Sequence, residues 1–383
     1  MRLLGLIAVA LAGLAGCSTL ETPSAVSVPG SVPGSVSVPR TASPKPAPPA
    51  AKPLTGPALA ARLLPPGLAE RSGWASDIHD TLLMLRIEPS AQNICAVVAL
   101  TEQESGFRAD PSVPGLTEIA RKEIERRRES AGVPKFMLRA ALALPSTDGR
   151  SYSARLSAAT TERQLSDIFE DFAGRVPLAR KFLADQNPVR TGGPMQVSVA
   201  FAQAHAAANP YPYPLSGSIR DEVFTRRGGI YFGIAHLLHY PAPYDEHLYR
   251  FADYNAGRYA SRNAAFQKAV SEASGVPLEL DGDLLTLTEA ATRRLAERLR
   301  MSGAEIRRDL ELGATAQFEQ TRLYAAVFAI ADGLHGKPAP RAVVPVIVLQ
   351  TAKTTRKLTT EGFARRVADR HRSCLARGLV RSI

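Results

Sequence analysis

Hydrophobic residues recur along most of this chain three or four positions apart, which is the spacing of helices with one buried face. The clearest stripe follows Ser90 and consists of Ile94, Val97, Val98 and Leu100. A second contains Leu165, Ile168, Phe169 and Phe172, and a third Leu287, Ala291, Leu295 and Leu299. The pattern predicts several amphipathic helices.

Polar residues at the expected helix starts favour the same fold class. Ser76 and Ser90 are placed as N-caps, and three pairs have the spacing of a capping box: Thr161 with Gln164, Thr286 with Glu289, and Ser302 with Glu305. Strand patterns are rare. The clearest covers 342–349, where Pro345 limits it to an edge strand or an extended segment. We therefore predict a mainly α protein.

The N-terminus has the pattern of a secretion signal. Arg2 precedes an apolar run over 3–14, which is too short to span a bilayer, and small residues lead to Cys17. This arrangement resembles the lipobox of bacterial lipoproteins, with 1–16 as signal peptide and Cys17 as the lipidated residue. The alternatives are an ordinary signal peptide cleaved near residue 15 or 16, or a core helix.

The composition of residues 17–57 predicts a disordered tether, because these residues are nearly all Ser, Val, Pro, Gly, Ala and Thr and have no hydrophobic period. By similarity to bacterial lipoproteins, Ser18 after Cys17 favours sorting to the outer membrane. The expected location is thus the periplasmic face of that membrane, with the lipid as membrane contact.

Charge narrows the choice of partner. The chain of 383 residues has a formal net charge of +11, which in a cytosolic protein would suggest nucleic acid. We expect no nucleic-acid partner for an exported protein. Peptidoglycan carries free carboxylates, and a basic surface concentrates such a polyanion. The alternative is that the charge reflects only the basic composition common among exported proteins.

Two cysteines remain after Cys17, namely Cys95 and Cys374. In an oxidising compartment such a pair favours a disulfide, which would pin a C-terminal helix against the helix that contains Cys95. Two buried free thiols are the alternative.

Three short strings carry the candidate chemistry. In chain order they are Glu104-Ser105-Gly106-Phe107, Gly193-Pro194-Met195-Gln196-Val197 and Tyr254-Asn255-Ala256-Gly257. Together they resemble the motifs of the soluble lytic transglycosylase and goose-type lysozyme superfamily. The resemblance implies a lysozyme-like helical core that binds peptidoglycan glycan strands.

Glu104 is the candidate general acid. It follows a largely apolar helical face through Val97 and Thr101, so burial and the negative end of the helix would favour its protonated form. A carboxyl kept protonated near neutral pH can donate to a glycosidic oxygen. Taken alone, Glu104 would be an ordinary surface or ion-paired residue, and the resemblance is what selects it.

The other strings supply the candidate substrate-binding residues. The family has Gly-Leu-Met-Gln at the start of a cleft helix, and here Pro194 replaces the Leu. The resemblance implies that Gln196 bonds an N-acetyl group, that Met195 packs on a sugar, that Tyr254 lies beside the acid and that Asn255 supports the site. Ser105, beside the acid, would help to hold sugar or peptide.

The implied reaction is cleavage of the bond between N-acetylmuramic acid and N-acetylglucosamine, with closure of a 1,6-anhydro ring. One carboxyl suffices because the nucleophile is intramolecular, whereas most glycosidases need two. No cofactor or metal is expected. Asp110 and Asp253 remain open as second carboxylates.

The chain departs from the family in two regions. A helical insertion is expected at about 116–191 within a catalytic domain over 58–274, and a helical extension over 275–383 that could bind envelope proteins. One alternative function is a non-catalytic peptidoglycan-binding or envelope-assembly lipoprotein. Another is a metallopeptidase using His236, His239 and His247, which is disfavoured because the His-Glu-x-x-His string is missing.

Overall fold

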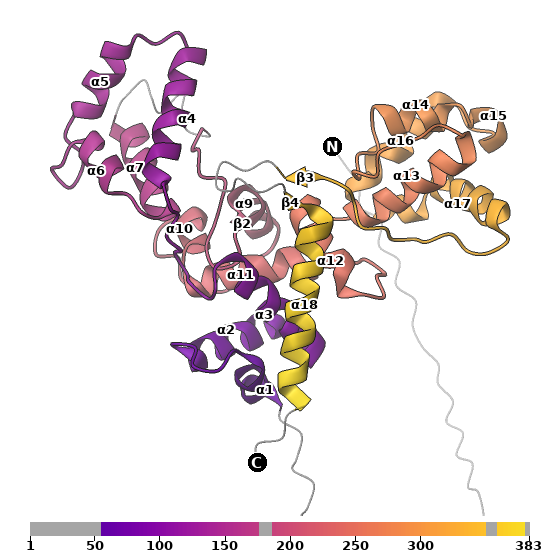
Figure 1. Ribbon diagram of the computed structural model, residues 1–383, viewed down its shortest axis with the longest axis horizontal. Helices are drawn as coiled ribbons and strands as arrows, with labels where there is room; N and C mark the ends of the chain where they lie inside the picture. Colours follow the sequence, from indigo (N-terminus) through magenta and orange to yellow (C-terminus); the bar gives the residue numbers. More distant parts are fainter. Residues whose placement is uncertain (1–54, 176–185, 350–357, 380–383) are drawn as a thin grey trace, which may run out of the picture. The chain divides into compact units, whose positions relative to one another are not determined.

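The computed structural model describes residues 55–175, 186–349 and 358–379, and within them the chain is mainly helical, as predicted (Figure 1). The predicted signal peptide, Cys17 and residues up to 54 of the predicted tether lie outside the described residues. The tether is expected to reach residue 57, but the first helix already begins at Gly56. Among the helices of the described ranges, none combines the length and apolar character needed to cross a membrane.

The first hydrophobic core joins segments from both ends of the described chain. Its helices are α1 (Gly56–Leu63), α2 (Arg71–Met84), α3 (Ala91–Glu104), α9 (Val199–Ala208), α10 (Ile219–Val223), α11 (Arg226–Leu238), α12 (His247–Ala256) and α18 (Thr360–Leu379). α18 packs along both α3 and α12 (Figure 1). The C-terminal helix is therefore part of this core, although the sequence suggested that it belongs to a separate extension.

Helix α3 is more deeply buried than its stripe predicts. Ser90 caps it, accepting the Asn93 N–H at 3.3 Å, as expected. Yet every residue from Ile94 to Thr101 is buried, and not only one face. The reason is that α1, α2, α11 and α18 all pack against it.

A second hydrophobic core lies between residues 260 and 339. Its elements are α13 (Ala260–Ser274), α14 (Leu287–Arg293), α15 (Ala296–Leu299), α16 (Gly303–Leu310), the 3₁₀ turns η1 (Glu311–Ala314) and η2 (Ala316–Gln320), and α17 (Arg322–His335). Phe266 of α13 packs edge-on against Phe318, with ring centroids 5.0 Å apart. The boundary expected at residue 274 thus falls after a helix that already belongs to this second core.

A third, smaller cluster is formed by α4 (Leu116–Ser130), α5 (Lys135–Ala143), α6 (Tyr152–Ala158) and α7 (Glu162–Arg175). We call these four helices the α4–α7 lobe. They fall within the expected insertion. The basic run in α4 is largely balanced along the helix, because Glu123 pairs with Arg126 and Arg127, and Glu125 with Arg128.

Strands within the described ranges form two short antiparallel pairs. β1 (Thr191–Gly192) pairs with β2 (Val197–Ser198), and β3 (Val348–Leu349) with β4 (Leu358–Thr359). Of the segment 342–349, only Val348 and Leu349 form a strand; residues 342–347 belong to no strand.

Some of the predicted helix caps form and others do not. Ser302 and Glu305 form the predicted capping box, and Gln164 and Thr161 exchange the corresponding hydrogen bonds. Thr286 does not cap its helix: its φ is 53°, outside the extended region usual for an N-cap, and its hydroxyl donates to Asp283 at 3.4 Å. Ser76 is also no N-cap: α2 begins five residues earlier, at Arg71, after the left-handed Glu70.

Candidate functional site

Glu104 is the last residue of α3, and its side chain is half-buried. The chain turns sharply after it, because Gly106 and Phe107 both have left-handed backbone, with φ of 58° and 63°. The Phe107 ring is buried and packs edge-on against Trp74, with centroids 5.3 Å apart. This anchor fixes the exit of the chain just beyond Glu104.

Ser105 lies next to Glu104 but is engaged with its own backbone. Its hydroxyl donates to the Thr101 carbonyl at 3.2 Å and accepts the Arg108 N–H at 3.2 Å. The side chain is buried. It closes the end of α3, so its hydroxyl is not presented for the predicted contact with sugar or peptide.

The second string forms a hairpin turn where the resemblance implied a helix start. Gly193 and Gln196 have left-handed φ values of 74° and 51°, which a first helical turn cannot accommodate. The Gln196 N–H donates to the Gly193 carbonyl at 3.1 Å and closes the turn between β1 and β2. Helix α9 begins only at Val199, with Ser198 as its N-cap.

This turn packs tightly on α11. A Cβ on Gly193 would lie 1.9 Å from the Val223 carbonyl oxygen, so only glycine fits there. One helical turn apart on α11, Gly229 contacts Pro194 and Gly233 contacts Met195, each too closely to leave room for a methyl group. Glycines on α11 thus provide the space into which the turn is pressed.

Met195 is fully buried as a result. Its side chain fills the space over Gly233, so it supports the turn from inside and offers no surface for the predicted contact with a sugar face. Gln196 remains half-buried, and its side-chain amide donates to the Gly193 carbonyl at 3.3 Å. Of these two neighbours, only Gln196 reaches the surface.

Tyr254, near the end of α12, connects this turn to Glu104. Its hydroxyl donates to the Met195 carbonyl at 2.8 Å. Burial raises the pKa of Tyr254 well above its ordinary value, and the negative charge of Glu104 adds to the increase. The Glu104 carboxylate therefore lies within electrostatic reach of the phenol. The structure therefore brings together residues from all three strings.

Asn255 follows Tyr254 but is exposed, and it contacts the start of α18. Its Oδ1 accepts a hydrogen bond from the Thr360 hydroxyl at 3.2 Å. α18 also reaches the final turn of α3, where Arg370 pairs with Glu102 at 2.6 Å and bonds Gln103 at 3.2 Å. Asn255 thus ties the third string to the C-terminal helix.

A disulfide between the two remaining cysteines also joins α18 to α3. Cys95 in α3 is bonded to Cys374 in α18, with Cα atoms 5.5 Å apart and 279 positions between them in sequence. The structure thus selects the disulfide over two free thiols, and it pins the C-terminal helix to the helix that ends at Glu104.

Asp253 is a structural anchor. It is 1% exposed and accepts hydrogen bonds from the Tyr240 and Tyr244 hydroxyls and from the backbone N–H groups of Tyr259 and Ser261. Burial raises its pKa although these hydrogen bonds oppose the increase. Both of its oxygens are engaged, so it holds the end of α12 and is not placed as a second reacting carboxylate.

A family model described as a protein of unknown function (DUF1615) matches residues 67–377. The chain belongs to the DUF1615 family. It is 50% identical over 319 residues to the uncharacterized protein YaiW of Escherichia coli (strain K12), which corresponds to 82% of this chain and 87% of that protein. No solved structure is significantly similar.

The DUF1615 match spans the three strings, the α4–α7 lobe and nearly all of α18. The sequence predicts the contact of the C-terminal helix with α3 through the two cysteines, but it does not predict the contacts of Thr360 and Arg370, which carry no motif. It also missed His236 as a neighbour of the site: its ring lies 4.6 Å from the ring of Tyr254 and 4.6 Å from that of Phe201.

Within the part of this DUF1615 chain that the structure describes, no three His, Cys, Asp or Glu side chains are grouped to hold a metal ion. His236 packs on Tyr254, whereas His247 bonds Asn93 at 3.3 Å and lies beside His371. The metallopeptidase alternative therefore lacks a ligand set in these residues.

Proposed function

We propose that this protein is a peptidoglycan lytic transglycosylase. The observation that carries the proposal is the hydrogen bond from Tyr254 to the turn that bears Gln196, together with the electrostatic influence of Glu104 on the same phenol. A half-buried carboxyl, a phenol and a partly exposed carboxamide from three distant segments thus lie in one region. These are the residue types, in the same order, that the transglycosylase motifs use.

Glu104 would act first as an acid and then as a base. Its proton passes to the oxygen that links N-acetylmuramic acid to N-acetylglucosamine, and the bond from that oxygen to the muramic acid C1 breaks. The neighbouring acetamido oxygen stabilises C1. The Glu104 carboxylate then accepts the proton of the muramic acid 6-hydroxyl as that oxygen bonds to C1, so one carboxyl completes the cycle.

Tyr254 would position this chemistry. Its own proton is engaged by the Met195 carbonyl, and its raised pKa keeps the phenol neutral. It therefore adds no charge beside Glu104, and its oxygen can still accept a hydrogen bond. Gln196, held at the turn, would bond an N-acetyl group.

The proposal includes the location inferred from the N-terminus: a lipid on Cys17 and a tether that lets the folded part reach the cell wall from the outer membrane. The net charge of +11 suits a substrate that bears carboxylates. Peptidoglycan strands are the proposed partner, and envelope proteins could bind the second core.

The decisive experiment is digestion of purified sacculi by the full chain, followed by mass analysis of the soluble fragments. We expect muropeptides with 1,6-anhydro ends from the wild type and none from Glu104→Gln. Glu102→Gln is the matched control, since it changes a carboxylate two residues away that pairs with Arg370. That variant should retain full activity.

Other products would overturn the proposal. Reducing ends would indicate a lysozyme, and cleaved stem peptides a peptidase. Sacculus binding without fragments would favour the non-catalytic alternative. One observation supports that alternative: Ser105 and Met195, two predicted substrate contacts, are buried within the protein.

A further inference from the structure

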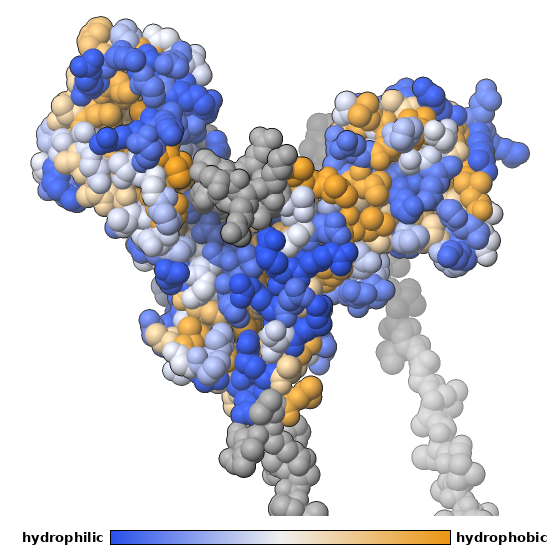
Figure 2. All heavy atoms as spheres, viewed as in Figure 1, coloured by the Kyte–Doolittle hydropathy of each residue, from blue (hydrophilic) through white to orange (hydrophobic). Residues whose placement is uncertain are grey.

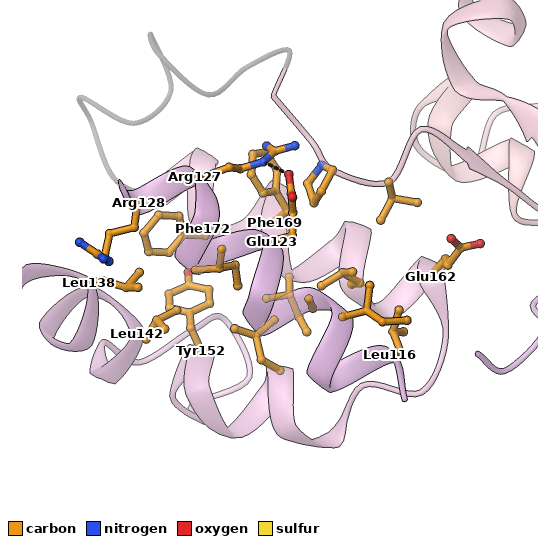
Figure 3. Close-up of a pocket in the computed structure, with 18 of the residues that line it drawn as sticks. Leu116, Glu123, Arg127, Arg128, Leu138, Leu142, Tyr152, Glu162, Phe169 and Phe172 are labelled. Atoms are coloured by element: carbon orange, nitrogen blue, oxygen red, sulfur yellow. Dashed lines mark hydrogen bonds and ion pairs between the residues drawn. The ribbon is translucent and has the colours of Figure 1, made fainter. Parts of the chain in front are cut away.

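A cavity of about 460 Å³ lies within the α4–α7 lobe, and no part of the proposed reaction uses it (Figure 3). Hydrocarbon dominates its walls, as the lining residues Leu116, Ile124, Leu142, Leu156, Leu165 and Phe172 show. Charged groups are few, and two of them neutralise each other, because Arg127 donates to Glu123 at 2.6 Å. This size and lining are typical of a site for a small apolar ligand.

One polar atom in the wall lacks a partner. Tyr152 is 2% exposed, and its hydroxyl makes no hydrogen bond of normal geometry with the described residues, although the Asp171 carboxylate is close enough to interact with it. Burial raises the pKa of Tyr152, and the nearby Asp171 carboxylate adds to the increase. An unpaired buried hydroxyl is costly, and a ligand that supplies one acceptor atom would remove that cost.

This lining discriminates between ligand classes. A peptide carries a donor and an acceptor at nearly every residue, and a sugar carries several hydroxyls, so either would lose hydrogen bonds here. A hydrocarbon chain loses none. A chain with a single oxygen-bearing end group matches both the apolar walls and the Tyr152 hydroxyl.

Helix α5 indicates that such a hydrocarbon chain would come from a membrane. Its Leu138 and Leu142 line the cavity, while on its outer surface Phe136 and Met137 are 70% and 53% exposed. Lys135 and Arg139 are also exposed, and Figure 2 shows hydrophobic surface on this lobe. Exposed apolar residues among basic ones are the features of a helix that lies at a membrane surface.

We propose that the α4–α7 lobe binds one acyl chain of a membrane lipid in this cavity, and that α5 is the element that contacts the bilayer. The Tyr152 hydroxyl donates to an oxygen of the lipid ester or carboxylate. This inference does not depend on the transglycosylase reaction.

The first test measures binding of radiolabelled palmitic acid by equilibrium dialysis. The full chain carries Cys17→Ser, which keeps attached lipid out of the assay. We expect one palmitate per chain, and at least tenfold weaker binding by Leu165→Trp, which fills the cavity. Leu287→Trp is the control, since Leu287 lies outside the lobe and is 71% exposed. No binding, or equal binding by Leu165→Trp, would overturn the proposal.

The second test isolates the hydroxyl. Tyr152→Phe should weaken palmitate binding about three- to tenfold, in the range of one lost hydrogen bond, and leave the binding of hexadecane unchanged because hexadecane has no polar atom. An equal loss for both ligands would show that Tyr152 only packs the lobe, and would contradict the assigned donor role.

The third test asks whether the bound acyl chain comes from a membrane lipid or from free fatty acid. Vesicles containing phosphatidylglycerol with a labelled acyl chain are mixed with the protein, and label transfer is followed after separation. Replacing Phe136 and Met137 by Ser should slow transfer several-fold without changing palmitate affinity in dialysis. Unchanged transfer would exclude α5 as the membrane contact and indicate free fatty acid as the source.

Discussion

The phenol of Tyr254 donates a 2.8 Å hydrogen bond to the carbonyl oxygen of Met195, which lies 59 positions earlier in the chain. This bond joins the end of α12 to the β1–β2 turn, and the same phenol lies within the electrostatic reach of Glu104. One side chain is therefore bonded to the second segment and interacts electrostatically with the first, so it links the three segments on which the proposed reaction depends.

Tyr254→Phe should test that role. It leaves the buried Met195 carbonyl without its partner, so we expect a loss of about 1–2 kcal/mol in the free energy of unfolding. Because the turn would no longer be bonded to the residue that interacts electrostatically with Glu104, sacculus cleavage should fall roughly 10- to 100-fold. Urea denaturation and the rate of muropeptide release measure the two effects.

Tyr244→Phe provides the comparison, since it removes a different phenol bond, from Tyr244 to Asp253 at 2.8 Å. It should cost a similar amount of stability but much less activity. Equal losses of activity in the two variants would mean that Tyr254 contributes only to stability.

Gly233→Ala should disturb the site without changing any polar group. The added methyl would lie 2.3 Å from the Met195 Sδ and 2.7 Å from its Cβ, so the turn must shift. We expect a loss of about 1–3 kcal/mol and a reduced cleavage rate. Gly333→Ala is the matched helix substitution: nothing lies within 4 Å of its new methyl, and it should stabilise α17 by roughly 0.5–1 kcal/mol. A Gly233→Ala protein as stable as wild type would contradict the close packing of turn and helix.

The sequence predicts local features of this fold better than the contacts between distant segments. The helix ending at Glu104 is foreseeable because Ser90 and the apolar stripe after it act within one element. The turn at 193–196 cannot be foreseen in this way, since nothing in the local pattern requires Gln196 to adopt a positive φ. The packing of the turn against α11 imposes that conformation.

Contacts between residues far apart in the chain are the main feature that the sequence does not predict. Arg370 meets Glu102 across 268 positions, and an isolated arginine in an amphipathic helix gives no sign of its partner. The cysteines were the exception, because their number and the inferred compartment indicated a pair. The burial of Met195 likewise depends on Gly233 in another helix, so a motif match alone could not distinguish an internal support from a ligand contact.

The Cys95–Cys374 disulfide should be a major source of stability for the first core. It closes a long loop and therefore restricts the unfolded chain, so reduction should lower the free energy of unfolding by about 2–5 kcal/mol. Urea denaturation with and without dithiothreitol measures this loss. In a variant with both residues replaced by Ser, dithiothreitol should have no further effect. Equal stability of the oxidised and reduced wild-type protein would contradict this role.

Stability should also fall in mild acid, and His236 should account for part of the loss. Burial, with Arg258 nearby, lowers the pKa of His236 from 6.5 to about 4. Between these values the unfolded chain binds a proton that the folded chain does not. The contribution of this residue is therefore complete above pH 6.5, and it declines by up to about 1.4 kcal/mol per pH unit as the pH falls toward 4.

His236→Phe removes this proton while keeping a ring between Phe201 and Tyr254. The free energy of unfolding, measured by urea denaturation from pH 4 to 7, should then depend less steeply on pH than in the wild type. His335→Gln replaces an exposed histidine that pairs with Glu272 in the second core, so it controls for the loss of a histidine elsewhere. If His236→Phe kept the full acid sensitivity, the buried neutral imidazole beside Tyr254 would not be its source, and His205 and His247, which burial also shifts to a pKa of about 4, would be the next residues to replace.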